Sequence, residues 1–152
     1  LRQFVLYHMF KIPLYCYEDG MQLRDFVSVR DIASAHLLII QNKKSDFNVY
    51  NVGGGKKYTV LDLAKMVCKV MGRPYIITKT GEYRVGDIRH AVSDITSLKK
   101  LGWIPKQTEE ENIREFIEWV SEVKPSKKLV INAIKNLKRK VKIGKSFSKK
   151  VS

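Results

Sequence analysis

The chain contains 152 residues, of which 44% are hydrophobic and 29% charged, and its formal net charge is +14. A chain of this length can bury one hydrophobic core but is short for two, so we expect one compact unit with a tail. The charge is uneven: residues 123–152 hold eleven of the 29 basic residues and no acid, which leaves 18 bases against 15 acids in the body. Any case for a polyanionic partner, nucleic acid or an acidic membrane surface, therefore rests on the tail alone.

Cys16 and Cys68 are the two cysteines, and they form no CxxC pair. So sparse a pattern predicts neither a disulfide framework nor a zinc site. No apolar run reaches the ~18 to 20 residues of a membrane span, and the first residues lack the long apolar core of a signal peptide. We therefore expect a cytoplasmic protein without a membrane span. Its first residue is Leu rather than Met, which fits a fragment.

The first part of the chain alternates helical and strand-like segments. Apolar residues at helical spacings predict a first helix that ends before Pro13, because proline disfavours helix in the residue preceding it. Two short runs rich in aromatic or β-branched residues, 14–17 and 26–29, predict strands on either side of a turn at 18–20. Asp31 is the predicted cap of the next helix, whose apolar face holds Ile32, Ala35, Leu38 and Ile39.

The second part continues this α/β pattern. Residues 47–52 are typical of a strand, residues 53–55 of a glycine loop, and Thr59 of the cap of a following helix. Farther along, a strand is predicted at 75–78 and helices at 95–101 and 109–119.

The tail after Pro125 is predicted to form a basic amphipathic helix, because its apolar residues share one face and its lysines and arginines occupy the rest. That face holds Val130, Ile134, Leu137 and Val141. The end of the chain, beyond Gly144, is expected to be disordered. The sequence thus divides into a body, 1–122, and a tail, 123–152.

Two arginines and an aspartate are candidates for binding an anionic ligand. Arg24 and Arg84 each lie beside a predicted turn, and a guanidinium suits a diphosphate because it is permanently charged and donates two parallel hydrogen bonds. Asp87 follows Gly86 and could bind sugar hydroxyls. From residue chemistry alone, however, an Arg near an Asp is more often a surface ion pair or a loop staple.

Three ordered blocks carry a resemblance to a known family. They are EDGMQLRDFVSVRDIA, FNVYNVGGG and YRVGDIRHAVSDITSLKKLGW. Together they resemble the C-terminal, substrate-binding part of the extended short-chain dehydrogenases/reductases, the NAD-dependent nucleotide-sugar epimerases and dehydratases. The resemblance covers residues 1 to about 122. It implies an α/β fold in which the strand-helix unit that starts at residue 47 joins the edge of a Rossmann sheet, and that sheet is missing from this chain.

The resemblance also implies which residues bind the substrate. Arg24 and Arg84 would contact the phosphates of a nucleotide sugar, and Asp87 the ribose. Tyr15 and Tyr17 lie on the strand that passes the nucleotide base. NAD would be bound by the missing N-terminal domain, so the resemblance places no catalytic, cofactor-binding or metal-binding residue in this chain.

Three motifs imitate functional sites. Tyr7 and Lys11 fit the Tyr-x-x-x-Lys spacing of the superfamily's catalytic pair, but any residues at i and i+4 meet on a helix. The loop 53–55 imitates a phosphate loop but lacks its spacing, and the family uses this loop as a structural connection. His90 could titrate near neutral pH, yet a lone histidine beside a strand is more often structural.

The resemblance therefore predicts the substrate-binding half of an NAD-dependent epimerase, a 4-epimerase of a UDP- or dTDP-sugar, inactive on its own. Its parent would be a homodimer. The alternatives are a fragment of a nucleotide-sugar dehydratase and a non-catalytic module whose basic tail contacts a polyanion or another subunit. For the tail itself, a terminal helix packed on the body is favoured over a nucleic-acid arm.

Overall fold

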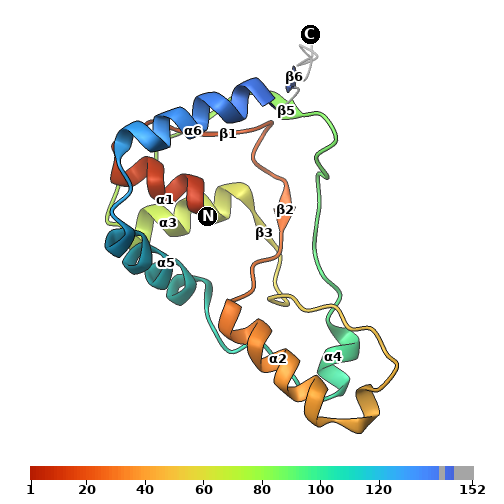
Figure 1. The fold of residues 1–152 in the computed structure, drawn as a ribbon. Coiled ribbons are helices and arrows are strands. Elements are labelled where there is room, and N and C mark those ends of the chain that lie inside the picture. The colour runs from red at the N-terminus through yellow and green to blue at the C-terminus, as the bar shows by residue number, and fades with distance from the viewer. Residues whose placement is uncertain (141–142, 146–152) are drawn as a thin grey trace.

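The computed structural model describes residues 1–140 and 143–145, and its helices gather at two ends of the molecule (Figure 1). Four helices lie at one end: α1 (Arg2–Met9), α3 (Val60–Val70), α5 (Glu109–Val123) and α6 (Lys127–Lys140). Two lie at the other: α2 (Val29–Gln41) and α4 (Thr96–Lys100). A short 3-10 helix, η1 (Lys43–Ser45), follows α2. The α/β class predicted from the sequence is confirmed.

The strands are short and form three separate pairs in the described residues. β1 (Leu14–Cys16) runs parallel to β4 (Ile77–Lys79). β2 (Leu23–Arg24) runs antiparallel to β3 (Tyr58–Thr59) and lies between the two groups of helices (Figure 1). β5 (Glu82–Arg84) pairs antiparallel with β6 (Ile143–Lys145), which the sequence did not predict.

The larger core lies among α1, α3, α5 and β1. Helix α3 begins as predicted, because Thr59 and Asp62 form a reciprocal capping box at its N-terminus. Its inward face packs against the apolar faces of α1 and α5, as helices with a single apolar stripe require. The buried residues of this core are Phe4, Val5, Tyr7, Leu14, Leu63, Ala64, Val67, Cys68 and Ile113.

The second core lies between α2 and α4, where Ala35, Ile95, Leu98 and Trp103 are buried. The indole N–H of Trp103 donates to Oγ of Ser34 at 2.9 Å and so joins the segment after α4 to α2. This smaller core holds the end of the molecule that is remote from α1.

Two predictions at the start of α2 were wrong. Residues 26–29 form no strand; the pairing strand is β2, which lies earlier. Ser28, not Asp31, caps the helix by accepting from the N–H of Arg30. Asp31 is 4% exposed, and its carboxylate accepts from the backbone N–H groups of Lys106 and Gln107 at 3.0 and 3.1 Å. A residue that looked like a local cap is thus a long-range link to the segment before α5.

Residues 47–52 have the sequence pattern of a strand, but they pair with no strand in the described part of the chain. Phe47 has a positive φ of 60°, and Phe47 and Val49 are fully exposed. Tyr50 and Val52 pack against the second core. A strand needs a partner for its backbone N–H and C=O groups. Residues 47–52 therefore have the alternating exposed and packed side chains of a strand without its hydrogen bonds to a neighbouring strand.

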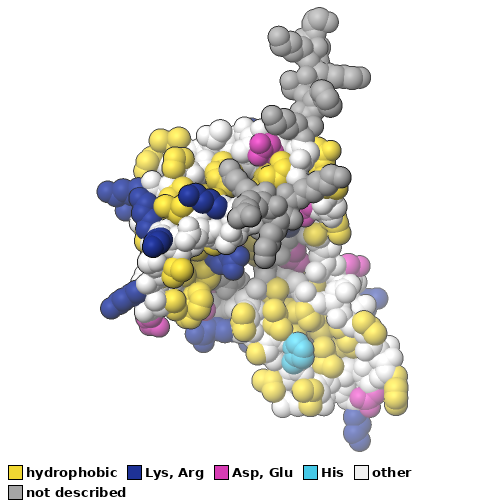
Figure 2. Space-filling model, turned by 45° about the horizontal axis from the view of Figure 1, so that its top comes forward, with side chains coloured by type: hydrophobic (Ala, Val, Ile, Leu, Met, Phe, Trp, Pro, Cys, Tyr) yellow, Lys and Arg dark blue, Asp and Glu magenta, His cyan; other side chains and the backbone are white. Residues whose placement is uncertain are grey.

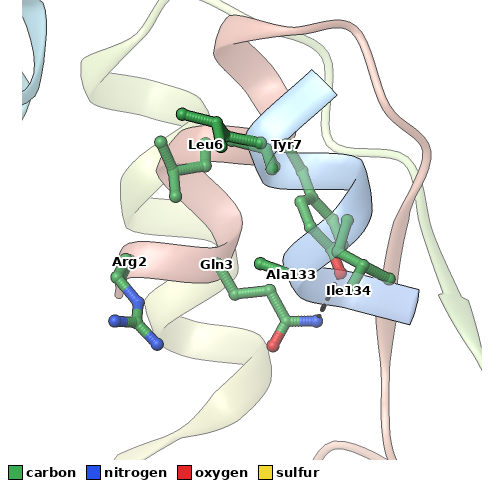
Figure 3. A pocket seen from close by; sticks show the side chains of 8 residues that line it. Arg2, Gln3, Leu6, Tyr7, Ala133 and Ile134 are labelled. Atoms are coloured by element: carbon green, nitrogen blue, oxygen red, sulfur yellow. Dashed lines mark hydrogen bonds between the residues drawn. The ribbon is translucent and has the colours of Figure 1, made fainter. Parts of the chain in front are cut away.

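Helix α6 packs on α1, as the favoured interpretation of the tail predicts. Val130 is 7% exposed and Ile134 packs against the larger core. Figure 3 shows Ala133 and Ile134 of α6 facing Gln3 and Tyr7 of α1. Three parts of the predicted tail lie outside the described residues: the side chain of Leu137, the residue Val141, and the end beyond residue 145, for which disorder was expected.

The remaining elements follow the predictions with shifted ends. The strand expected at 75–78 is β4, and the helix expected at 109–119 continues to Val123 in α5.

Figure 2 shows lysine and arginine side chains clustered at the end of the molecule that carries α6, and a mostly apolar and neutral face at the other end. Among the described residues, no helix combines the length and apolar character that crossing a membrane requires.

Candidate functional site

All five residues that the resemblance assigned to the substrate line one cavity of about 330 Å³. They come from three segments: β1 and the turn after it, β2, and the stretch from β5 to Asp87. The fold thus brings together side chains that lie more than 60 positions apart. These residues are Tyr15, Tyr17, Arg24, Arg84 and Asp87.

Arg24 is held at the cavity by backbone and carboxylate oxygens. Its Nη1 donates to the carbonyl oxygens of Leu23 and Arg89, each at 2.8 Å. Its Nη2 lies 3.6 Å from Oδ1 of Asp87. The side chain is 26% exposed, so the guanidinium is fixed in direction while one edge of it still meets the cavity. A fixed, permanently charged donor of this kind suits a phosphate.

Arg84 packs over an aromatic ring. The centre of its guanidinium lies 4.9 Å from the ring centroid of Tyr17, within the range of a cation–π contact. Its Nε is buried and has no hydrogen-bond partner among the described residues. A buried N–H without an acceptor costs free energy, so a ligand that supplies an acceptor there would recover it. The two arginines and Asp87 therefore bring two positive charges and one negative charge to the same cavity.

Tyr15 and Tyr17 form an aromatic wall of the cavity, and Tyr7, which does not line it, packs against Tyr15. The rings of Tyr15 and Tyr17 meet edge to face at 6.3 Å, and those of Tyr7 and Tyr15 lie 5.4 Å apart. The hydroxyls of Tyr7 and Tyr15 are 2.8 Å apart, and Gln3 donates to the hydroxyl of Tyr7 at 2.9 Å. This wall lends the cavity rigid apolar surface beside its charged groups.

An ion-pair cluster that the sequence did not predict lies next to the cavity, which Glu18 of this cluster lines. Arg89 forms ion pairs with Glu18 and, at 2.7 Å, with Asp19, both in the turn after β1. Hydrogen bonding from Arg89 lowers the pKa of Asp19 below its ordinary value. Because the carbonyl oxygen of Arg89 also accepts from Arg24, this cluster joins the turn to the arginine that faces the cavity.

Sequence reasoning missed other residues of the cavity, among them Gln3, Phe4, Glu18 and Gln22. Gln22 could have been found, because it lies two positions before Arg24 and alternate residues of a strand share a face. Gln3 and Phe4 could not, since their approach depends on how α1 packs on α3.

Tyr7 and Lys11 do not form a catalytic pair. Tyr7 is 2% exposed, and burial, together with the hydrogen bond to Tyr15, raises its pKa well above the ordinary value. A catalytic tyrosine needs the opposite shift. Lys11 lies past the end of α1, is exposed and has a positive φ of 53°, so the two residues do not share a helical turn.

The glycine loop at 53–55 does not fit the diphosphate of NAD. The N–H of Gly54 already donates to Oδ1 of Asp25 at 2.7 Å, and a Cβ on Gly54 would come within 1.9 Å of the carbonyl oxygen of Phe26. A phosphate loop offers free N–H groups and positive potential, whereas this loop lies against a carboxylate. The described residues therefore form no NAD site at this loop.

His90 has a structural contact. Its Nδ1 accepts from the backbone N–H of Leu23 at 3.2 Å, which ties the segment after Asp87 to β2. In the described part of the chain, no group of three or more His, Cys, Asp or Glu side chains is arranged to hold a metal ion.

Comparisons with known proteins show which family the chain resembles. Residues 2–53 match the model of the NAD dependent epimerase/dehydratase family. The chain is 36% identical to a dTDP-L-rhamnose 4-epimerase of Burkholderia thailandensis, over 73% of this chain and 30% of that protein. It is 35% identical to a UDP-glucose 4-epimerase of Haemophilus influenzae, over 66% of this chain and 30% of that protein.

Solved structures give the same relationship. The chain superposes on UDP-glucose 4-epimerase of Thermotoga maritima with UDP-glucose, with a TM-score of 0.68 and 29% identity, covering 80% of this chain and 39% of that one. It also matches dTDP-glucose 4,6-dehydratase of Bacillus anthracis in complex with NAD, with a TM-score of 0.67 and 25% identity over 78% of this chain and 38% of that one.

These matches confirm the expected relationship. This chain corresponds to the C-terminal part of an extended short-chain dehydrogenase/reductase of the NAD-dependent epimerase/dehydratase family. It spans about 30% of the length of the curated relatives and under two fifths of the solved structures.

Proposed function

We propose that this chain binds the nucleoside diphosphate of a UDP- or dTDP-sugar as part of an NAD-dependent nucleotide-sugar 4-epimerase. One observation carries the proposal: Arg24, Arg84 and Asp87 line a single cavity whose wall is formed by Tyr15 and Tyr17. Two guanidinium groups suit a diphosphate, a carboxylate suits ribose hydroxyls, and aromatic rings suit a planar base. The 4-epimerases among the relatives are the observation that favours epimerase over dehydratase chemistry.

In such an enzyme NAD supplies the hydride chemistry, and it would be held by the Rossmann domain of the family. The part of this chain is to bind and orient. Arg24 and Arg84 hold the diphosphate at a fixed distance from the reacting sugar, because both guanidinium groups are themselves anchored, one on carbonyl oxygens and one over Tyr17. Such anchoring supplies positioning, and positioning alone does not break a C–H bond.

We therefore expect the 152-residue chain to bind UDP and dTDP but to show no epimerase turnover.

We place the enzyme in the cytoplasm, because Cys16 and Cys68 are both free thiols, and a reducing compartment favours free thiols. Its parent would act as a homodimer.

Isothermal titration calorimetry with UDP and dTDP tests the proposal. Arg24→Ala and Arg84→Ala should each weaken binding by about tenfold or more, since each removes a charge-assisted contact worth about 1.5–3 kcal/mol. Arg30→Ala is the matched control, because Arg30 is 72% exposed, pairs with Glu115 and lies outside the cavity.

Two results would contradict the proposal. One is the absence of binding by the unaltered chain at millimolar nucleotide, and the other is an equal loss in Arg30→Ala. Turnover of a UDP- or dTDP-sugar with added NAD by this chain alone would contradict the expected inactivity.

A further inference from the structure

We propose that Gln22 selects the base of the nucleotide by accepting a hydrogen bond from the N3–H group of uracil or thymine. The inference rests on the proposed function, because it assigns a base to the cavity in which Arg24 and Arg84 would bind the diphosphate. Gln22 lines that same cavity, two residues before Arg24 on the segment that leads into β2.

Gln22 is a buried polar residue with half of its amide unused. Its side chain is buried and the residue is 6% exposed. Nε2 donates to the carbonyl oxygen of Tyr17 at 3.0 Å. Oε1 is buried and has no hydrogen-bond partner among the described residues. The backbone is held as well, since the N–H of Val60 donates to the carbonyl oxygen of Gln22 at 3.1 Å.

The contact with Tyr17 fixes which way the amide points. A carbonyl oxygen accepts only, so the nitrogen of the amide must face Tyr17 and Oε1 must face away from it. Turning the amide over would set two acceptor oxygens against each other. Because Gln22 lines the cavity, its unpaired oxygen is an acceptor of fixed polarity beside that cavity, and a ligand that donates to it recovers the cost of the unpaired oxygen.

This polarity distinguishes the pyrimidine bases. Uracil and thymine carry a donor at N3, whereas cytosine carries an acceptor at N3. Cytosine at the same place would leave Oε1 unpaired and facing a second acceptor. A site rejects a near relative of its ligand when binding that relative leaves a buried polar group without a partner. Tyr15 and Tyr17 line the same cavity and supply aromatic surface for a planar base.

A purely structural role is the competing explanation. Nε of Arg84 is also buried without a partner in the described residues, and it is a donor where Oε1 of Gln22 is an acceptor. The two atoms could pair with each other, because both residues line the same cavity. In that case Gln22 would affect stability and the affinity for every nucleotide alike, and it would not affect the choice of base.

The test compares three nucleotides by titration calorimetry on the full 152-residue chain: UDP, CDP and UDP methylated at N3. The unaltered chain should bind CDP and the methylated UDP about tenfold or more weaker than UDP, the ratio expected for one hydrogen bond to a buried acceptor. In Gln22→Leu the three affinities should lie within about twofold of one another. Gln41→Leu, at an exposed glutamine on the last turn of α2, is the matched control and should keep the discrimination.

The outcomes separate this inference from the proposed function. If the unaltered chain binds no UDP, both fail. If UDP binds through Arg24 and Arg84 but the methylated UDP binds equally well, the role of Gln22 is overturned and the diphosphate site stands. If Gln22→Leu loses affinity for all three nucleotides and keeps their ratios, the structural role is correct. Where the variant does not fold, equal binding of UDP and methylated UDP by the unaltered chain still overturns the role of Gln22.

Discussion

The backbone N–H of Gly54 donates to Oδ1 of Asp25 at 2.7 Å, and Oδ2 of the same carboxylate accepts from the N–H of Ser93 at 3.2 Å. Asp25 therefore joins three segments: the end of β2, the glycine loop at 53–55 and the stretch that follows His90. Because Asp25 is the neighbour of Arg24, the carboxylate that occupies the glycine loop also fixes the backbone that presents the arginine to the cavity.

Asp25→Asn should destabilise the chain by about 1–3 kcal/mol, because the amide keeps one acceptor and sets its NH₂ group against the N–H of Gly54 or Ser93. Urea denaturation followed by circular dichroism measures this loss. Asp46→Asn is the control, because Asp46 is exposed and takes part in neither of these two hydrogen bonds. Equal midpoints for the two variants would show that Asp25 does not join these segments.

Arg89 is expected to act on the nucleotide site without touching it. Arg89→Gln removes the ion pairs to Glu18 and Asp19 and frees the turn after β1, whose neighbour Tyr17 stacks with Arg84. UDP affinity should fall by a few fold, less than for Arg24→Ala, and the loss should shrink as salt is added, because exposed ion pairs are screened. A loss as large as that of Arg24→Ala would instead place Arg89 on the ligand.

The sequence predicted best what is local. The Thr59 cap of α3 and the turn after β1 depend on a few adjacent residues, and both were predicted. Asp31 was misassigned because Ser28 and Asp31 both have capping side chains, and only the approach of residues 106 and 107 shows which of them is needed elsewhere.

The site needed more than local pattern. Arg24 and Arg84 were candidates on charge alone, but their meeting depends on parallel pairing of β1 with β4, a contact between segments about 60 residues apart. The resemblance predicted that both arginines contact one ligand, which periodicity did not, and neither predicted this pairing. Residues 47–52 show the converse limit: their alternation is that of a strand, but pairing requires a second strand that the described residues do not provide.

The capping box of α3 makes stability depend on pH in the acid range. Asp62 accepts from the hydroxyl and the N–H of Thr59, at 2.6 and 3.0 Å, and these bonds lower its pKa below the ordinary 3.8. Because the folded pKa is the lower one, the unfolded chain binds the proton first as pH falls. The contribution of Asp62 is therefore fully present above about pH 4 and is lost as pH drops below 3.8.

Asp62→Asn should accordingly be less stable than the unaltered chain at pH 7, and the difference should narrow as pH falls from 4 toward 2. Urea midpoints measured across that range test the sign. A difference that stays constant across this range would show that the carboxylate charge of Asp62 does not contribute to the cap.

Two adjacent residues of α6 test whether the basic tail is a packed helix. Val130 is 7% exposed at the interface with α1, whereas Leu129 is 66% exposed. Val130→Ala should cost about 1–2 kcal/mol, the usual cost of removing buried methyl groups, and Leu129→Ala less than about 0.5 kcal/mol. If the tail instead stood away from the body as a polyanion-binding arm, both substitutions would leave the urea midpoint unchanged. Binding to a nucleic acid, lost on removing residues 123–152 and weakened by salt, would then be the result that favours the arm.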